Sequence, residues 1–393
     1  MTTGCKSALD FVSPLVKELP KSGIRKFFDI VAGRKDIISL GIGEPDFATP
    51  WHICEAAISS MENGATHYTA NLGMPELRRE LAGYMERSFK ASYDPKTEIM
   101  VSVGVSEAMD ATLRTVLSPG DEVIYHEPCF VAYAPLIRMA GGVPVPVETL
   151  RKDEFRIDVA ALEKVVTPRT KVLLLNYPNN PTGAVLRRAD AEAIADFVLR
   201  HDLLLVSDEV YSELTYDEER VSFASIKRLR DRLVFLNGFS KTWAMTGFRL
   251  GFLCAPAPLT DCIMKVHQYG IMSAPTVSQA AAVEALRNGD SDVASMRQEY
   301  DRRRRFIVRS LNEAGLDCFM PNGAFYVFPS IMSTGLTSDE FALRLLEEKG
   351  VACVPGSAFG RCGEGFLRCS YATGMEQLKE AMVRITEFAA GLR

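Results

Sequence analysis

The chain has 393 residues, of which 47% are apolar and 24% are charged, and its formal net charge is −5 at pH 7. This composition is ordinary for a soluble globular protein of two or three domains. A mildly acidic chain has no general attraction to nucleic acid or anionic membranes, so we expect neither as a partner.

The nine cysteines are odd in number and include no CxxC pair. This pattern favours a reducing compartment and indicates neither a disulfide framework nor a bound metal. The N-terminal segment has no apolar core of signal-peptide length, and no apolar run approaches the roughly 20 residues that span a bilayer. We therefore expect a cytoplasmic protein without a membrane span.

Strand-like and helix-like segments alternate along the middle of the chain. The expected strands are 98–104, 121–128, 143–149, 170–178, 203–211, 231–239 and 248–256, and the clearest helices are 106–117, 131–142, 158–166 and 187–202. Continuous apolar strands that alternate with helices of about a dozen residues are typical of a mostly parallel sheet covered on both faces. Residues 46–280 are therefore predicted to form a large, doubly wound α/β domain.

The pattern changes after residue 280. A long charged helix over 293–315 precedes several short strands and a further helix, which predicts a smaller α+β domain made of 281–393 together with 1–45. The basic run 302–305 lies in the long helix and could mark a nucleic-acid site or a solvated helix face. Glu299 and Asp301 beside it, and the acidic chain as a whole, favour the solvated face.

Polar residues follow several of the expected strands, and ligands of open α/β sheets bind beyond the carboxyl ends of strands. The amides near Val105 and Ser106 would begin a helix and suit a phosphate, although an ordinary turn fits the same residues. Asn180, before Pro181, is either part of a turn or an amide aimed at a ligand.

Asp208, Lys241 and Arg249 are charged residues in otherwise apolar surroundings. Asp208 could cap a helix, but it ends a very apolar strand, and a buried carboxylate needs a partner. A lone lysine is usually a surface residue, whereas a lysine in an apolar cleft has a lowered pKa and can form a Schiff base. Together, these residues predict one ligand site at one edge of the sheet.

Four stretches resemble the class I/II aminotransferases, which are fold-type I enzymes dependent on pyridoxal 5′-phosphate (PLP). They are GEPDFATP (43–50), NNPTG (179–183), SDEVY (207–211) and SKTWAMTGFRLG (240–251). The similarity runs in order from about residue 20 to the C-terminus and is nearest to the aspartate/aromatic subgroup. It implies PLP as the cofactor and the fold type I architecture, with a large α/β domain and a smaller α+β domain.

The resemblance implies roles around the cofactor ring. Lys241 would bind PLP as a Schiff base, and Asp208 would pair with the protonated pyridine nitrogen. Tyr211 and Asn180 would donate hydrogen bonds to the phenolic oxygen, and Phe130 would stack on the ring. The implied catalytic residues are Lys241, Asp208 and Tyr211.

The resemblance also implies how the two ends of the site are bound. Arg249, Ser240 and the amides of Val105 and Ser106 would bind the phosphate. Tyr68 would reach the phosphate of a neighbouring subunit, which implies a homodimer with shared sites. Arg368, with the Gly43 backbone and Asn180, would bind the substrate α-carboxylate.

The implied reaction is ping-pong transfer of an α-amino group to 2-oxoglutarate. Aspartate-specific relatives often carry a lysine where Ser106 stands and a tryptophan where Phe130 stands. We therefore expect an amino acid with an aromatic or other neutral side chain to be favoured over aspartate as the donor.

Other functions remain open. An aspartate aminotransferase, or a carbon–sulfur β-lyase of the same fold, would use the same lysine and aspartate, because fold and cofactor do not decide the reaction. A PLP-sensing transcription regulator fits less well, because the segment before residue 40 is too short for a helix-turn-helix module. A nucleotide-binding dehydrogenase fits poorly, because no glycine fingerprint follows the first strand.

Overall fold

The computed structural model describes residues 7–19 and 36–392, so parts of the predicted N-terminal segment, 1–6 and 20–35, lie outside it. The helices are α1 (Pro14–Glu18), α3 (Trp51–Glu62), α4 (Pro75–Phe89), α5 (Gly104–Val116), α6 (Tyr133–Met139), α7 (Val159–Glu163), α8 (Arg188–Arg200), α9 (Phe239–Thr242), α10 (Ala257–Gly270), α11 (Thr276–Asn288), α12 (Asp290–Glu313), α13 (Ser338–Lys349) and α14 (Met375–Gly391). The strands are β1 (Ile38–Ser39), β2 (Ile99–Ser102), β3 (Glu122–Glu127), β4 (Val143–Glu148), β5 (Thr170–Asn176), β6 (Leu204–Asp208), β7 (Leu233–Gly238), β8 (Gly251–Cys254), β9 (Tyr326–Val327), β10 (Val351–Ala352), β11 (Val354–Pro355) and β12 (Leu367–Ser370).

A seven-stranded sheet in the order β2-β8-β7-β6-β5-β3-β4 forms the centre of the larger part of the chain. Only β8 runs antiparallel to its neighbours, which confirms the predicted mostly parallel sheet. The connection from β7 to β8 contains α9 and a 3₁₀ turn, with no long crossover helix. The chain therefore returns antiparallel, because a parallel return needs a longer crossover. β4, with Pro144 and Pro146, lies at an edge, where missing amide donors are tolerated.

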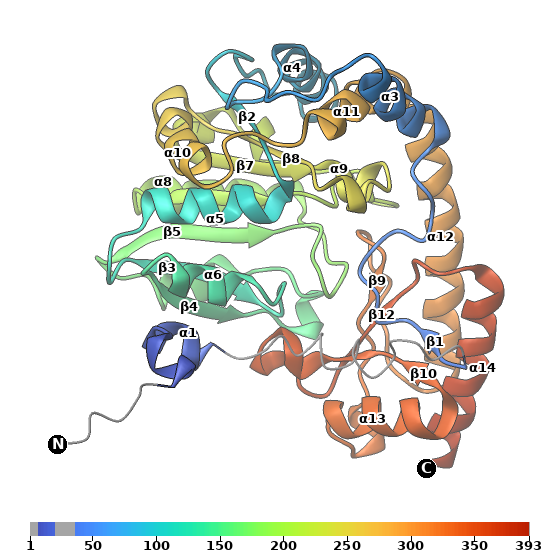
Figure 1. Ribbon diagram of the computed structural model, residues 1–393. Coiled ribbons are helices and arrows are strands. Elements are labelled where there is room, and N and C mark those ends of the chain that lie inside the picture. The colour runs from blue at the N-terminus through green and yellow to red at the C-terminus, as the bar shows by residue number, and fades with distance from the viewer. Residues whose placement is uncertain (1–6, 20–35, 393) are drawn as a thin grey trace.

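Helices cover both faces of this sheet (Figure 1). Along β5, Val172 and Leu174 belong to the same apolar cluster as residues of α5, α6 and α10. Leu173 and Leu175 point the other way, into the cluster that contains residues of α4, α8 and α11. The continuous apolar strand therefore has two buried faces, as expected for a doubly wound sheet.

The C-terminal part has its own apolar cluster, which involves α12, α13, α14, β9, β10 and β12. β11, β12 and β9 form an antiparallel sheet, and β1 pairs in parallel with β10 through Ile38 and Val351. The segment after residue 36 thus lies against the C-terminal part of the chain (Figure 1). The division into two domains near residue 280 stays a prediction.

The basic run 302–305 in α12 does not form the solvated helix face that the sequence predicts. Arg302 and Arg305 are solvated, but Arg303 is 5% exposed and Arg304 is fully buried. Successive helical residues point about 100° apart, so four arginines in a row cannot share one face. The buried pair is compensated by carboxylates: Asp46 and Glu299 for Arg303, and Asp217 and Asp301 for Arg304.

A helix that is both long enough and apolar enough to cross a bilayer does not occur within 7–19 or 36–392. The same ranges hold no group of three or more histidine, cysteine, aspartate or glutamate side chains arranged to bind a metal ion.

Candidate active site

The candidate site is a cavity of about 700 Å³ at the carboxyl ends of β5, β6 and β7. The structure places eleven of the predicted site residues in its wall: Gly43, Val105, Ser106, Phe130, Asn180, Asp208, Tyr211, Ser240, Lys241, Arg249 and Arg368. Tyr68 is the exception, since it is 81% exposed and lies outside the lining of the cavity.

Asp208 is a buried carboxylate at the end of β6. Its Oδ2 accepts a hydrogen bond from the Tyr133 hydroxyl at 2.8 Å, and its Oδ1 accepts one from the Val210 amide at 3.2 Å. Burial raises the pKa of Asp208 to about 6, although these two hydrogen bonds and the charge of Lys241 oppose that rise. A cationic group inside the cavity would therefore stabilise this carboxylate.

Lys241 lies in α9, one turn beyond the end of β7. Its Nζ donates a hydrogen bond to the carbonyl of Gly43 at 2.6 Å. Burial lowers the pKa of Lys241 to about 8, and the positive charges of Arg368 and Arg249 act in the same direction. An amine with this pKa loses its proton far more readily than an exposed lysine, so a neutral fraction is available near physiological pH to act as a nucleophile or a base.

The N-terminus of α5 and Arg249 lie together in the cavity wall. Gly104, the first residue of α5, has a φ of +76°, and a Cβ there would lie 2.8 Å from the Arg249 guanidinium. Gly251 approaches so closely that its Cβ would lie 2.6 Å from the Val105 amide nitrogen. Two glycines thus let the guanidinium and the first amides of α5 lie side by side, which suits a phosphate.

Arg368 lies in β12, is buried, and lines the same cavity. Its terminal nitrogens donate to the Asn180 side-chain oxygen at 3.0 Å and to the Gly41 carbonyl at 2.5 Å. Its Nε has no hydrogen-bond partner among the described residues. The side chain lines the cavity, and each terminal nitrogen carries a second N–H, so the guanidinium is suited to a carboxylate there.

Three further residues contact the predicted ones but escaped the sequence analysis. Tyr133 binds Asp208, and Asn176 donates to the Asp208 carbonyl at 2.8 Å. The Tyr326 hydroxyl lies 2.9 Å from that of Tyr211. Asn176 could have been found, because it is a polar residue near the end of the expected strand 170–178. The two tyrosines carry no local signal.

Comparisons with known proteins agree with this geometry. A family model described as aminotransferase class I and II matches residues 35–385. An aspartate aminotransferase from Pyrococcus abyssi is 50% identical over 380 residues, which cover 96% of each chain. Aromatic-amino-acid aminotransferase 2 from Thermococcus litoralis is 48% identical over 367 residues, covering 93% of this chain and 94% of the relative. The crystal structure of an aromatic aminotransferase from Pyrococcus horikoshii superposes with a TM-score of 0.89 at 47% identity, covering 94% of this chain and 99% of the other.

Proposed function

This chain belongs to the class I and II aminotransferases, enzymes that depend on PLP, and we propose that it prefers donors with aromatic or other neutral side chains to aspartate. The proposed acceptor is 2-oxoglutarate, in a ping-pong reaction in which donor and acceptor occupy the same cavity in turn.

The residues of the cavity fit the cofactor. The buried carboxylate of Asp208 would hold the pyridine nitrogen, and Phe130 would lie against the ring. The cradle of Arg249, Ser240 and the first amides of α5 would hold the phosphate, while Lys241 would hold the aldehyde end. When bound, PLP supplies an electron sink that stabilises negative charge at the substrate α-carbon.

The chain's own groups would perform the remaining steps. Arg368 would fix the substrate α-carboxylate, because a guanidinium binds two carboxylate oxygens at once. This contact would direct the α-carbon toward Lys241 Nζ, which, with its lowered pKa, could accept the proton from that carbon. Asn180, bonded to Arg368, would keep the guanidinium oriented.

The proposed donor preference rests on the charges of the side chains that line the cavity. Among the described residues, the cations in the wall are Lys241, Arg249 and Arg368, and the proposed roles engage all three. Glu44 adds a negative charge, and Ile42, Met109, Phe130 and Leu136 add apolar surface. A neutral side chain would lose little in such a site, whereas a second carboxylate would be desolvated without a cation from these residues.

A donor panel tests this proposal. With 2-oxoglutarate as acceptor, kcat/KM is measured for phenylalanine, tyrosine, leucine, alanine and aspartate, and we expect the aromatic and leucine donors to exceed aspartate. Aspartate winning by more than tenfold would overturn the preference and favour an aspartate aminotransferase, as the name of the Pyrococcus abyssi relative suggests. The proposed acceptor is tested by measuring kcat/KM with pyruvate or oxaloacetate in place of 2-oxoglutarate, under otherwise identical conditions.

We also propose a homodimer in which Tyr68 serves the neighbouring subunit. Tyr68 is exposed on a segment that is held to 272–276 by two hydrogen bonds, from Asn71 to the Met272 carbonyl and from Thr276 to the His67 carbonyl. Exposed apolar side chains of Tyr269, Ile271 and Met272 lie in or just before that second segment. Exposed aromatic and apolar side chains on adjoining segments are typical of a subunit interface.

A further inference from the structure

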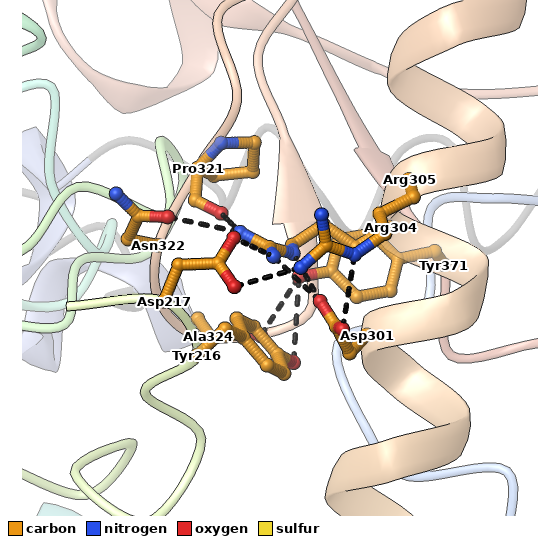
Figure 2. Close-up of polar contacts among 9 residues, drawn as sticks. All are labelled: Tyr216, Asp217, Asp301, Arg304, Arg305, Pro321, Asn322, Ala324 and Tyr371. Carbon is orange, nitrogen blue, oxygen red and sulfur yellow. Dashed lines mark hydrogen bonds and ion pairs between the residues drawn. The ribbon is translucent and has the colours of Figure 1, made fainter.

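The buried Arg304 uses every N–H of its guanidinium. Figure 2 shows its side chain between α12 and two loops. Nε and Nη2 donate to Asp301 at 2.8 and 2.5 Å, and Nη2 also donates to Asp217 at 2.5 Å. Nη1 donates to the Pro321 carbonyl at 2.8 Å and to the Asn322 side-chain oxygen at 2.9 Å. An arginine has five N–H donors, so this guanidinium is fully satisfied.

Arg304 therefore joins two segments that are distant in sequence. Asp217 lies in the loop after β6, and Pro321 and Asn322 lie in the loop before β9. The two segments also bond to each other, since the Tyr216 amide donates to the Asn322 carbonyl at 3.0 Å. The guanidinium lies 4.7 Å from the centre of the Tyr216 ring, which packs against its face.

Two tyrosine hydroxyls continue this network toward β9 (Figure 2). Tyr216 and Tyr371 both donate to the Ala324 carbonyl, at 2.6 and 2.9 Å. Ala324 has a φ of +57°, a conformation that a residue with a side chain adopts at a cost of about 1 kcal/mol or more. The hydroxyls thus help to hold a bend that would otherwise relax, two residues before Tyr326.

The bend leads to the substrate end of the cavity. The Tyr326 hydroxyl meets that of Tyr211 at 2.9 Å, and the Tyr326 ring lies beneath the Arg368 guanidinium at 4.7 Å. Tyr326 and Arg368 also occupy neighbouring antiparallel strands, since Ser370 pairs with Tyr326. A displacement of β9 would therefore move the ring that supports Arg368.

We propose that Arg304 is a positioning residue for substrate binding: by clamping the Asp217 and 321–322 loops, it fixes Tyr326 under Arg368. This inference rests on the proposed role of Arg368 in binding the substrate α-carboxylate. It does not depend on which donor is preferred, because every amino acid donor carries that carboxylate.

The test compares Arg304→Met with Arg305→Met. Arg305 pairs with the same two carboxylates, Asp217 at 2.7 Å and Asp301 at 3.1 Å, but from the exposed side of the helix. Both variants lose an arginine next to the same acids, so Arg305→Met is a matched control. Steady-state kinetics use the donor that the wild type turns over fastest, and bound PLP is quantified by absorbance.

We expect Arg304→Met to raise KM for the donor and for 2-oxoglutarate by about tenfold, because small displacements of a binding group are costly, with less change in kcat and full PLP occupancy. We expect Arg305→Met to stay within about twofold of the wild type, since exposed ion pairs contribute little. Hydrogen exchange should also quicken at the Ala324 amide in Arg304→Met, because its bond to the Leu214 carbonyl lies in the clamped region.

Equal KM values for the two methionine variants would overturn the inference, even if Arg304→Met alone lowered Tm. If Arg304→Met does not fold, Tyr216→Phe serves instead, and the expected rise in KM is then about threefold, since one hydrogen bond is removed. Its control is Tyr177→Phe, which also loses a buried hydrogen bond to a carbonyl but lies outside the cavity wall. Arg368→Lys is measured in parallel. An unchanged KM in that variant would contradict the proposed site itself, which distinguishes that failure from the failure of the clamp.

Discussion

Asp208, for which we propose a role in cofactor binding and catalysis, shows how a buried site residue can oppose folding. Its pKa rises from 3.8 to about 6 in the folded chain, so the folded state binds the proton more tightly than the unfolded state does. The contribution of Asp208 to stability is therefore most favourable below about pH 4, and this contribution is lost as the pH rises from about 4 to about 6. Above pH 6 the ionised carboxylate costs the cofactor-free protein on the order of 2–3 kcal/mol.

Asp208→Asn should remove this cost. In the cofactor-free protein we expect the variant to gain stability relative to the wild type as the pH rises, by about 2 kcal/mol between pH 4 and pH 7. The Tyr133 hydroxyl can accept from the new amide as well as donate, so the variant keeps a partner. Urea unfolding at several pH values measures the difference. Asp261→Asn, at an exposed position, is the control and should show no such trend, whereas a pH-independent difference for Asp208→Asn would contradict the argument.

In the role that we propose for Lys241, its amine would have to be neutral to react. We expect Lys241→Ala to lower kcat/KM by at least about a thousandfold, since both the covalent attachment and the proton transfer would be lost. Lys265→Ala, an exposed lysine in α10, should leave turnover unchanged. Borohydride treatment followed by mass spectrometry should label the wild type and the Lys265 variant only. A full-occupancy label in Lys241→Ala would identify another lysine as the anchor.

At the scale of elements, the position of a site residue can be predicted from the sequence where the pattern that indicates it lies in neighbouring residues. Asp208, Lys241 and the first turn of α5 follow strands that are almost entirely apolar, so their position at the sheet edge could be predicted. Tyr133 reaches Asp208 across 75 residues of chain, and Tyr326 reaches Tyr211 across 115. No periodicity or spacing encodes such contacts. They arise only when strands and loops from distant parts of the chain come together.

The same reasoning explains the arginines of α12. Helical periodicity predicts that residues 302–305 point in different directions, but it does not show which of those directions is buried. Which arginines are buried depends on carboxylates from distant parts of the chain. Asp46 pairs with Arg303, and Asp217 pairs with Arg304. Without such partners, burying two guanidinium groups would cost several kcal/mol each.

The start of α5 offers a test at this scale. Gly104 and Gly120 both have positive φ, at +76° and +92°, so alanine at either position should cost about 1–3 kcal/mol of stability through backbone strain. Only at Gly104 would the new Cβ meet Arg249, at 2.8 Å, whereas at Gly120 it meets open space. We therefore expect similar losses of Tm, but an increase of about tenfold or more in Kd for PLP in Gly104→Ala alone.

Fluorescence titration of the cofactor-free variants measures that difference, and inorganic phosphate as a competitor reports on the cradle separately. If Gly120→Ala weakens PLP binding as much as Gly104→Ala does, strain spreading through the fold explains the loss. The close approach of Arg249 to α5 would then not be the cause.

At the scale of the whole molecule, the described cavity lacks one residue that the resemblance assigns to it. Tyr68 lies exposed outside the wall, although every other predicted residue lines it. If a second copy of the chain supplies Tyr68, each active site is built from two subunits, as can occur where a symmetric interface borders a cavity.

Mixed dimers test whether Tyr68 serves the active site of the opposite chain. Lys241→Ala and Tyr68→Ala each damage both sites of their own homodimer. In a hybrid, one site carries both substitutions, and the other combines an intact Lys241 with an intact Tyr68 from the opposite chain. Random mixing makes half of the dimers hybrids, so activity should recover to about a quarter of the wild-type value. If Tyr68 instead acts within its own chain, no intact site forms and mixing restores nothing. An affinity tag on one of the two chains allows the hybrid to be isolated and confirms that subunits have exchanged, which makes an absence of recovery a contradiction of the shared site.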